Sequence, residues 1–298
     1  HVDGLLVQPV NARNLYVELA RCLGVFDERK PELDRRKAGP QLQWARFRGL
    51  DILLVEDIEI NQEVIRELLA NVGLTVRIAA NGAEAIEAVG RQCPDLILMD
   101  CHMPVMDGYE ATRRLRADPR WHALPIIALT ANATTADQEM CFAAGMNAHV
   151  AKPIRMQRLY EKMDQCLPGL GSDAFDPVGG TRQGAMEPTG LPNFPGIDVA
   201  IGLTHVGGRL ALYLRLLKQF RDGHCRNFSR QFGEARDAGD WEVQVRLAHT
   251  LKGVADMLGA VELKEAAVAL LAAAQAKDAK VCAACLLGVL AQLEIVAV

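Results

Sequence analysis

Five polar side chains follow short apolar stretches of the sequence, at points where strands are expected to end. The apolar stretches are ILLV (52–55), LILM (96–99), PIIAL (125–129) and HVA (149–151). The residues that follow them are Glu56, Asp57, Asp100, Thr130 and Lys152. Because these stretches alternate with helical patterns, they predict a parallel sheet with both faces covered. Ligands bind at the carboxyl ends of the strands in such sheets, so these side chains are expected to gather at one edge.

The side chains expected at this edge suit phosphoryl transfer. Clustered carboxylates repel one another unless a cation neutralises them, and their oxygen atoms are ligands that Mg²⁺ prefers. Mg²⁺ orients a phosphoryl group and offsets its charge during in-line attack. Asp100 would be the nucleophile, Lys152 a second positive charge and Thr130 a hydrogen-bond donor to a phosphoryl oxygen. The alternative, ordinary polar residues at strand ends, is reasonable for one position but not for the whole set.

A second candidate site lies in the stretch LAHTLKGVADMLGA, residues 247–260, which has helical spacing. His249, Lys252, Gly253 and Asp256 stand at positions i, i+3, i+4 and i+7 and so share one face. A phosphorylated imidazole gains negative charge, which Lys252 one turn away can offset. Glycine inside a helix costs about 1 kcal/mol relative to alanine, a cost that makes sense if the backbone of another protein approaches beside His249. A lone histidine would be a structural residue, but the neighbouring Lys-Gly pair favours a phosphoacceptor.

The stretches DILLVED, LILMDCHMPVMDG, ALTAN and AKPI resemble the receiver domain of response regulators, over about residues 48–167. The resemblance implies an α/β fold of the flavodoxin-like (βα)5 type with strand order 2-1-3-4-5. It also implies that Asp100 is the phosphoacceptor. By the same likeness, Mg²⁺ is held by Glu56, Asp57, Asp100 and the backbone carbonyl of His102.

The receiver resemblance gives roles to further positions after the last strands. Thr130 is the expected switch hydroxyl. Lys152 is the expected phosphoryl-contacting lysine, followed by a cis peptide bond to Pro153. The switch residue three positions before this lysine is often Tyr or Phe in the family, whereas it is His149 here. The aromatic rotation of the family is therefore expected to be altered.

The sequence HTLKG, residues 249–253, resembles the H-x-L-K-G signature of the histidine phosphotransfer domain, and the likeness covers about residues 196–298. It implies an all-α, four-helix bundle on which His249 is the exposed phosphoacceptor, with Lys252 beside it. Asp256 stands where a small or neutral residue is more usual in the family. Asp256 is therefore expected to repel the phosphoryl group and to slow transfer.

An internal repeat marks the start of the chain. The stretch DGLLVQPVNARNLYVELARCLG from Asp3 matches NAHVAKPIRMQRLYEKMDQCLP from Asn147 without a gap. Residues 1–24 are therefore expected to be the C-terminal remnant of a preceding receiver domain. Gln8 stands where the second copy has Lys152, and a neutral amide cannot supply that positive charge. The preceding domain is therefore expected to be a non-phosphorylated pseudo-receiver.

Composition predicts the remaining boundaries. Residues 25–48 are highly charged and contain Pro and Gly, which predicts a linker before a receiver domain at 49–168. Residues 169–195 are rich in Pro and Gly without apolar periodicity, which predicts a flexible linker. Residues 196–298 then form the expected phosphotransfer domain.

The C-terminal stretch carries helical patterns and no strand signal. The patterns break near Gly207–Gly208, Gly239 and Lys277–Lys280, which predicts a bundle of helices. Val281–Val298 is apolar enough to raise the question of a membrane span, but its Glu294 and the charged turn before it favour a buried bundle helix. We therefore expect no membrane contact by this segment.

The bulk composition excludes several classes of partner and site. A net charge of −4 and an aromatic content of 5% argue against nucleic acid, which favours a basic face and stacking platforms. Eight cysteines without a disulfide framework indicate a reducing, cytoplasmic location. Cys282 and Cys285 have CxxC spacing inside a helical pattern, where small buried residues are a simpler interpretation than a metal or redox pair.

Together these features predict a phosphorelay module from the C-terminal part of a hybrid sensor histidine kinase. The phosphoryl group is expected to pass from a kinase histidine to Asp100, then to His249, and then to the receiver domain of a downstream response regulator. No ATP-binding kinase core is recognisable in these residues, so the kinase partner is expected elsewhere in the same parent chain. A membrane anchor of that parent would lie in its missing N-terminal part, and an enzymatic activity of this segment itself is left open.

The linker between the two domains bears on how transfer occurs. Its length of about 27 residues, from 169 to 195, would span about 25–30 Å as a flexible coil. That span permits His249 to reach Asp100 of the same molecule at an effective concentration of about millimolar. The sequence therefore predicts intramolecular transfer.

Two other functions are compatible with part of these residues. A signalling scaffold that binds two-component partners without accepting phosphate is the main alternative, although the complete acceptor set weighs against it. A Mg²⁺-dependent phosphatase that uses Asp100 is a further alternative. The second aspartate near the nucleophile of such hydrolases is absent here, because Cys101 and His102 follow Asp100.

Overall fold

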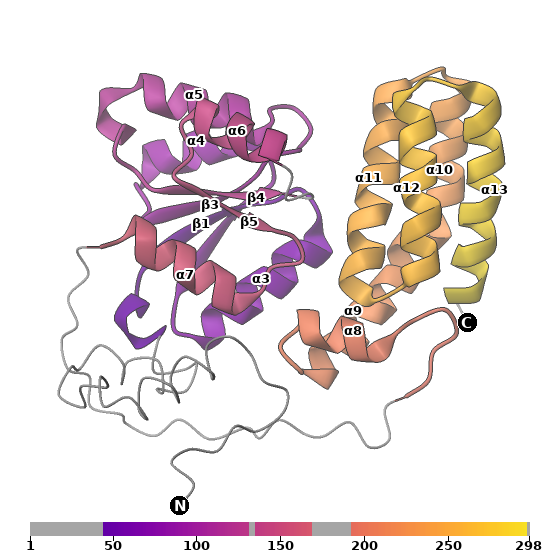
Figure 1. Cartoon of the computed structure of the whole chain (residues 1–298), viewed down its shortest axis with the longest axis horizontal. Helices are drawn as coiled ribbons and strands as arrows, with labels where there is room; N and C mark the ends of the chain where they lie inside the picture. The colour runs from indigo at the N-terminus through magenta and orange to yellow at the C-terminus, as the bar shows by residue number, and fades with distance from the viewer. Residues whose placement is uncertain (1–43, 131–134, 169–191, 297–298) are drawn as a thin grey trace, which may run out of the picture. The chain divides into compact units, whose positions relative to one another are not determined.

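The computed structural model describes residues 44–130, 135–168 and 192–296 (Figure 1). The predicted remnant at 1–24 lies outside the described residues, as do most of the predicted linkers at 25–48 and 169–195. The described residues form an α/β domain followed by a helical bundle, which confirms the predicted fold class.

Five parallel strands form one sheet in the order β2-β1-β3-β4-β5, the order that the sequence resemblance implies. Every residue of β3 and β4 is buried, because helices cover both faces of the sheet. The strands are β1 (Asp51–Val55), β2 (Thr75–Ala79), β3 (Leu96–Asp100), β4 (Ile126–Thr130) and β5 (Ala148–Ala151).

Helices form a layer on each face of the sheet. One layer consists of α4 (Gly82–Arg91), α5 (Gly108–Ala117) and α6 (Thr135–Ala144), and the other consists of α3 (Glu59–Asn71) and α7 (Met156–Cys166) (Figure 1). Each layer buries a separate cluster of apolar side chains against the sheet. Both faces of the sheet are therefore covered, and the ends of the strands remain accessible.

Parallel pairing of the strands brings the expected site residues level with one another. Glu56, immediately after β1, is level with Asp100 at the end of β3. Thr130 ends β4, and Lys152 follows β5 at the same edge. The register of the sheet thus positions side chains that are far apart in the sequence.

The α/β domain includes residues from the stretch that the sequence predicts to be linker. Trp44 and Phe47 precede the sheet, and both are buried. Their rings pack edge to face against the ring of Tyr160 on α7, with centroids 5.5 Å apart in each pair. Such aromatic contacts are favourable, so the turn that carries Trp44 and Phe47 belongs to the domain core.

A bundle of four long helices follows the α/β domain (Figure 1). The first is continuous and consists of α9 (Leu210–Gln219), a π-helical turn (Phe220–Cys225) and α10 (Arg226–Asp237). The others are α11 (Trp241–Leu258), α12 (Val261–Gln275) and α13 (Ala279–Val296), and the short α8 (Val199–His205) precedes all of them. No pattern in the sequence predicted the π-helical turn.

The predicted breaks between helices are confirmed, and one more is present. Positive φ angles occur at Gly207, Gly208, Gly239 and Lys277. Gly259, which no pattern predicted as a break, ends α11 with a φ of 77°. A Cβ atom at Gly259 would lie 2.3 Å from the carbonyl oxygen of Asp198, so the left-handed turn and the close packing both require glycine.

The last helix, α13, is long and apolar enough to cross a membrane by length and composition, the one such helix in the described part of the chain. One of its faces, with Cys282, Leu286, Val289 and Leu293, packs into the apolar core of the bundle. Cys282 is buried and Cys285 is half-buried within that packing. In the folded chain α13 is thus an element of the bundle, as the sequence predicts.

Candidate functional site

Three carboxylates meet at the carboxyl edge of the sheet. Glu56, Asp57 and Asp100 each offer an oxygen atom within 4.8 Å of the others, the one such group among the described residues. Burial raises the pKa of Glu56 to about 7 and that of Asp57 to about 6. The negative charge of Asp100 adds to both shifts, and the positive charge of Lys152 opposes them. The cluster therefore favours a cation that neutralises it.

Lys152 supplies a positive charge to this carboxylate cluster. Its Nζ lies 2.5 Å from Oε2 of Glu56 and 2.7 Å from Oδ2 of Asp100. Burial of the ammonium disfavours its charge, but the two carboxylates outweigh burial and raise the pKa of Lys152. The predicted cis peptide bond between Lys152 and Pro153 is present.

Sequence reasoning missed Asn61, a buried residue of α3. Its Nδ2 donates a hydrogen bond of 2.8 Å to Oε1 of Glu56. Both carboxylate oxygens of Glu56 are therefore engaged, one by Asn61 and the other by Lys152. The available signal was a polar residue within the buried stripe of α3, because a buried amide needs a hydrogen-bond partner.

Among the buried polar atoms without a hydrogen-bond partner in the described part of the chain, two belong to the strands β4 and β5. One is Oγ1 of Thr130, which is buried at the end of β4. A buried hydroxyl without a partner is costly, which fits a donor whose acceptor is an oxygen of a bound group. The other is Nδ1 of His149, whose ring packs edge to face on Phe142 with centroids 6.1 Å apart.

The loop after β3 holds the backbone of Asp100 through Gly108. A Cβ atom at Gly108 would lie 2.1 Å from the carbonyl oxygen of Asp100, so only glycine permits this approach. Asp107 starts α5 as its cap by accepting a hydrogen bond of 2.7 Å from the backbone N–H of Glu110. The backbone N–H of His102 donates to Oδ1 of Asp100 over 3.3 Å.

The structure brings the histidine of α11 to this same edge. The rings of His249 and His102 lie edge to face with centroids 5.8 Å apart. Burial lowers the pKa of His249 to about 4, although the negative charge of Asp100 opposes the shift. The imidazole of His249 is therefore neutral at a pH of about 7.

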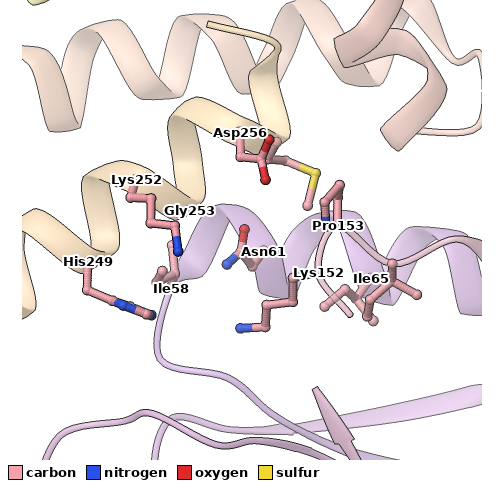
Figure 2. Close-up of a pocket in the computed structure, with 11 residues that line it drawn as sticks. Ile58, Asn61, Ile65, Lys152, Pro153, His249, Lys252, Gly253 and Asp256 are labelled. Atoms are coloured by element: carbon pink, nitrogen blue, oxygen red, sulfur yellow. The ribbon is translucent and has the colours of Figure 1, made fainter. Parts of the chain in front are cut away.

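The predicted face of α11 contacts the α/β domain. Figure 2 shows His249, Lys252 and Gly253 on this face, opposite Ile58, Asn61 and Lys152. A Cβ atom at Gly253 would have Cδ1 of Ile58 as its nearest neighbour, at 3.8 Å. Gly253 therefore has ordinary contact space beside Ile58, and the approach of another protein's backbone beside His249 stays a prediction.

Asp256 lies one turn beyond Gly253 and does not present an unpaired carboxylate to the site. Its Oδ1 forms an ion pair with Nζ of Lys264 on α12 at 2.8 Å. The positive charge of Lys264 offsets the negative charge of Asp256. The repulsion of a phosphoryl group that the sequence predicts at Asp256 is therefore weakened.

An apolar surface joins α3 to the bundle. Ile60, Val64 and Leu68 of α3 are buried in the same cluster as the core residues of the bundle. Two arginines, Arg209 and Arg215, border this surface and pair with glutamates of α3. Sequence patterns indicate which helix faces are apolar, but they do not indicate which faces meet, so these contacts were not predicted.

Two family matches accord with this geometry. Residues 52–164 match the response regulator receiver domain, and residues 215–297 match the Hpt domain. The chain therefore carries a receiver domain followed by an Hpt domain, as its motifs predict. Proteins that combine these domains act in phosphorelays, and this chain is a phosphorelay signalling module.

The chain is similar to parts of several histidine kinases. It is 39% identical over 142 residues to Histidine kinase 5 of Arabidopsis thaliana, a match that covers 39% of this chain and 15% of that protein. It is 38% identical over 115 residues to hybrid signal transduction histidine kinase E of Dictyostelium discoideum, covering 37% of this chain and 7% of that protein. The chain thus spans only a small part of the length of these relatives.

Among solved structures, the chain is similar to the receiver domain of a sensor histidine kinase of Pseudomonas aeruginosa, which has a magnesium ion coordinated in its active-site cleft. The two are 46% identical, and the match covers 40% of this chain and 98% of that chain with a TM-score of 0.38.

Proposed function

We propose that Asp100 accepts a phosphoryl group from the phosphohistidine of a kinase and exchanges it with His249, which passes it to a downstream receiver domain. The observation that carries this proposal is the place of His249. Its ring lies against that of His102, at the edge where Asp100 belongs to the carboxylate cluster. The expected acceptor of one domain therefore faces the expected acceptor of the other.

The exchange needs no water and no general base. A carboxylate oxygen of Asp100 attacks the phosphorus atom of the donor phosphohistidine, the phosphorus–nitrogen bond breaks, and the donor imidazole leaves. A ring nitrogen of His249 then attacks the phosphorus atom of the acyl phosphate, the phosphorus–oxygen bond breaks, and the carboxylate of Asp100 is restored. Each imidazole keeps the proton on its other ring nitrogen. The lowered pKa of His249 supports this step, because a neutral imidazole has its lone pair available.

Three further side chains are proposed to balance charge during transfer. Lys152, whose Nζ is 2.7 Å from Asp100, would offset the charge of the phosphoryl oxygens. Thr130, with its unpaired buried hydroxyl, would donate a hydrogen bond to one of those oxygens. Lys252 lies one turn from His249 on the same face and would offset the charge of the phosphohistidine.

We propose Mg²⁺ as the cofactor of the receiver domain. Glu56, Asp57, Asp100 and the backbone carbonyl of His102 would hold it. The donor set fits, because three carboxylates lie within 4.8 Å of one another and hard divalent cations prefer oxygen ligands. When bound, Mg²⁺ neutralises the carboxylates and the phosphoryl oxygens.

The parent protein is proposed to be a cytoplasmic or membrane-anchored hybrid sensor histidine kinase. The similar proteins are histidine kinases that extend far beyond the matched segment, which supports this placement. Its own kinase core would supply the phosphoryl group to Asp100. A separate response regulator would receive it from His249.

Phosphorylation by acetyl phosphate and Mg²⁺ tests the proposed acceptors. Intact mass would be measured for the wild type, Asp100→Ala and His249→Ala. A Mg²⁺-dependent label that disappears in Asp100→Ala is expected. A share of the label should be stable to alkali but lost in acid, and this share should disappear in His249→Ala. A folded wild-type chain that takes up no label would make the non-phosphorylated scaffold the better account.

A further inference from the structure

We propose that Arg209 and Arg215 of the Hpt domain are a recognition site for receiver domains whose first helix carries two glutamates one turn apart. Glu63 and Glu67 of α3 occupy this site in the chain itself. We call Arg209 and Arg215 the arginine pair and Glu63 and Glu67 the acidic pair. The inference rests on the proposed phosphotransfer and adds the chemistry by which the Hpt domain selects its receivers.

Three ion pairs join the arginine pair to the acidic pair. Nε of Arg215 lies 2.7 Å from Oε1 of Glu63, and Nη2 of Arg209 lies 3.0 Å from Oε2 of Glu67. Arg215 also pairs with Glu67 through its Nη2, so one guanidinium joins both members of the acidic pair. A planar guanidinium binds carboxylates in fixed directions, so this contact depends on where the acids stand and not only on their charge.

The acidic pair borders the apolar surface of α3. The side chains of Glu63 and Glu67 are 20% and 26% exposed. Beside them, Ile60, Val64 and Leu68 are buried in the bundle core. Apolar contact is non-directional, and any receiver with a similar stripe would provide it. The charges beside this apolar surface decide which receiver domain binds, because like charges facing each other there are unfavourable.

Both pairs lie away from the reacting atoms. Ile58, just before α3, is the residue that contacts Gly253 beside His249. Glu67 is nine residues further along the chain than Ile58, which corresponds to about 13 Å along an α-helix. A change in either pair therefore alters docking and removes no group of the transfer chemistry.

The arginine pair defines the chemistry of a suitable partner. A receiver that docks in the same orientation presents its first helix to Arg209 and Arg215. Carboxylates at the positions of Glu63 and Glu67 fit this site, whereas lysine or arginine there would be repelled. The downstream regulator is therefore expected to carry an acidic pair with the same four-residue spacing in its first helix.

A charge-reversal cycle in the intact chain tests this recognition. One variant reverses the acidic pair (Glu63→Arg with Glu67→Arg), a second reverses the arginine pair (Arg209→Glu with Arg215→Glu), and a third combines all four changes. After loading with acetyl phosphate and Mg²⁺, the movement of label from Asp100 to His249 is followed by its acid and alkali stability. Each one-sided reversal should slow transfer about tenfold, because attraction becomes repulsion. The combined reversal should restore the rate to within about threefold of the wild type.

Arg230→Glu is the matched control, because Arg230 lies on α10 and pairs with Glu234 of the same helix. Its transfer rate should equal that of the wild type. Loading of Asp100 should be unchanged in every variant, which also shows that the receiver domain is folded. Transfer at the wild-type rate in both one-sided reversals, or no recovery in the combined variant, would overturn the recognition role and leave the proposed function standing. A wild type without label would instead overturn the proposed function.

Discussion

The receiver edge and the histidine face of α11 are the two proposed halves of one transfer reaction, but they are built in different ways. At the receiver edge, Glu56, Asp100 and Lys152 come from different strand ends and already contact one another. On α11, His249 and Lys252 come from adjacent turns of one helix. The groups that act on the charge of His249 come mainly from the receiver edge. The receiver site is thus intrinsic to its fold, whereas the environment of the histidine depends on docking.

Removal of the positive charge from the receiver edge should have the largest effect on the free energy of unfolding. Lys152→Met leaves Glu56 and Asp100 buried without their ammonium partner. Without divalent cations, the free energy of unfolding should fall by about 3 kcal/mol, because an uncompensated buried charge is strongly destabilising. Mg²⁺ should restore part of the loss by neutralising the carboxylates. Urea unfolding with and without Mg²⁺ measures both effects.

Lys252→Met is the matched change on the histidine face. Lys252 is half-buried there, and no buried carboxylate depends on it within the described residues. The free energy of unfolding should change by less than about 0.5 kcal/mol, with no effect of Mg²⁺. Equal losses of stability in Lys152→Met and Lys252→Met would show that the receiver edge depends on its lysine no more than the histidine face does.

A methyl group at Gly108 should disturb the receiver edge next most strongly. The Cβ atom of Gly108→Ala would lie 2.1 Å from the carbonyl oxygen of Asp100, so the backbone on one side must move. The free energy of unfolding should fall by about 2 kcal/mol, and loading of Asp100 by acetyl phosphate should slow. Normal loading together with unchanged stability would mean that the loop adapts freely and that Gly108 does not position Asp100.

Acid should weaken docking through His249. The pKa of His249 is about 4 when docked, compared with an ordinary value of 6.5, so the docked state binds fewer protons. Docking is therefore fully favourable above a pH of about 6.5 and weakens as the pH falls towards about 4, by up to about tenfold per unit. Lys152, Lys252 and His102 reinforce this direction, while Asp100 opposes it.

The pH dependence is measured as the rate of transfer from preloaded Asp100 to His249. That rate should fall between a pH of about 6.5 and about 5, after correction for hydrolysis of the acyl phosphate, which is measured in His249→Ala. A transfer rate that rises over this interval would contradict the burial of a neutral imidazole in the docked state.

A methyl group at Gly253 should have little effect on transfer and gives a direct contrast with Gly108. Its Cβ atom would meet Cδ1 of Ile58 at 3.8 Å, an ordinary contact distance. Gly253→Ala should raise the free energy of unfolding by up to about 1 kcal/mol, because alanine favours the helix. Transfer should stay within about twofold of the wild type. A large loss of transfer would show that a closer approach occurs during the reaction than in the resting chain.

The sequence was sufficient to predict the receiver edge because burial imposes a strong pattern. Strands covered on both faces must be apolar, so Asp100 and Lys152 stand out at their ends. Helical periodicity likewise placed His249 and Lys252 on one face. The extra break at Gly259 was missed because the apolar pattern continues through it, and its need for glycine comes from close packing on Asp198.

The contacts between the two domains could not be predicted from the sequence. Glu63 and Glu67 are charged residues on a helix, and the usual expectation for such residues is a solvated face. Their role depends on Arg209 and Arg215, which are more than a hundred residues away in the chain. Asn61 was missed for a related reason, because its hydrogen bond to Glu56 is identified only by the geometry of the site.

Asp100 and His249 of one molecule are proposed to form one transfer site, and the most direct test is the dependence of transfer on protein concentration. Label on Asp100 of the wild type should move to His249 with a rate constant that does not change on dilution. A mixture of Asp100→Ala and His249→Ala chains permits transfer only between molecules. At micromolar concentrations it should be far slower, because the tethered domains have an effective concentration of about millimolar. A wild-type rate that falls in proportion to dilution and equals that of the mixture would contradict the claim.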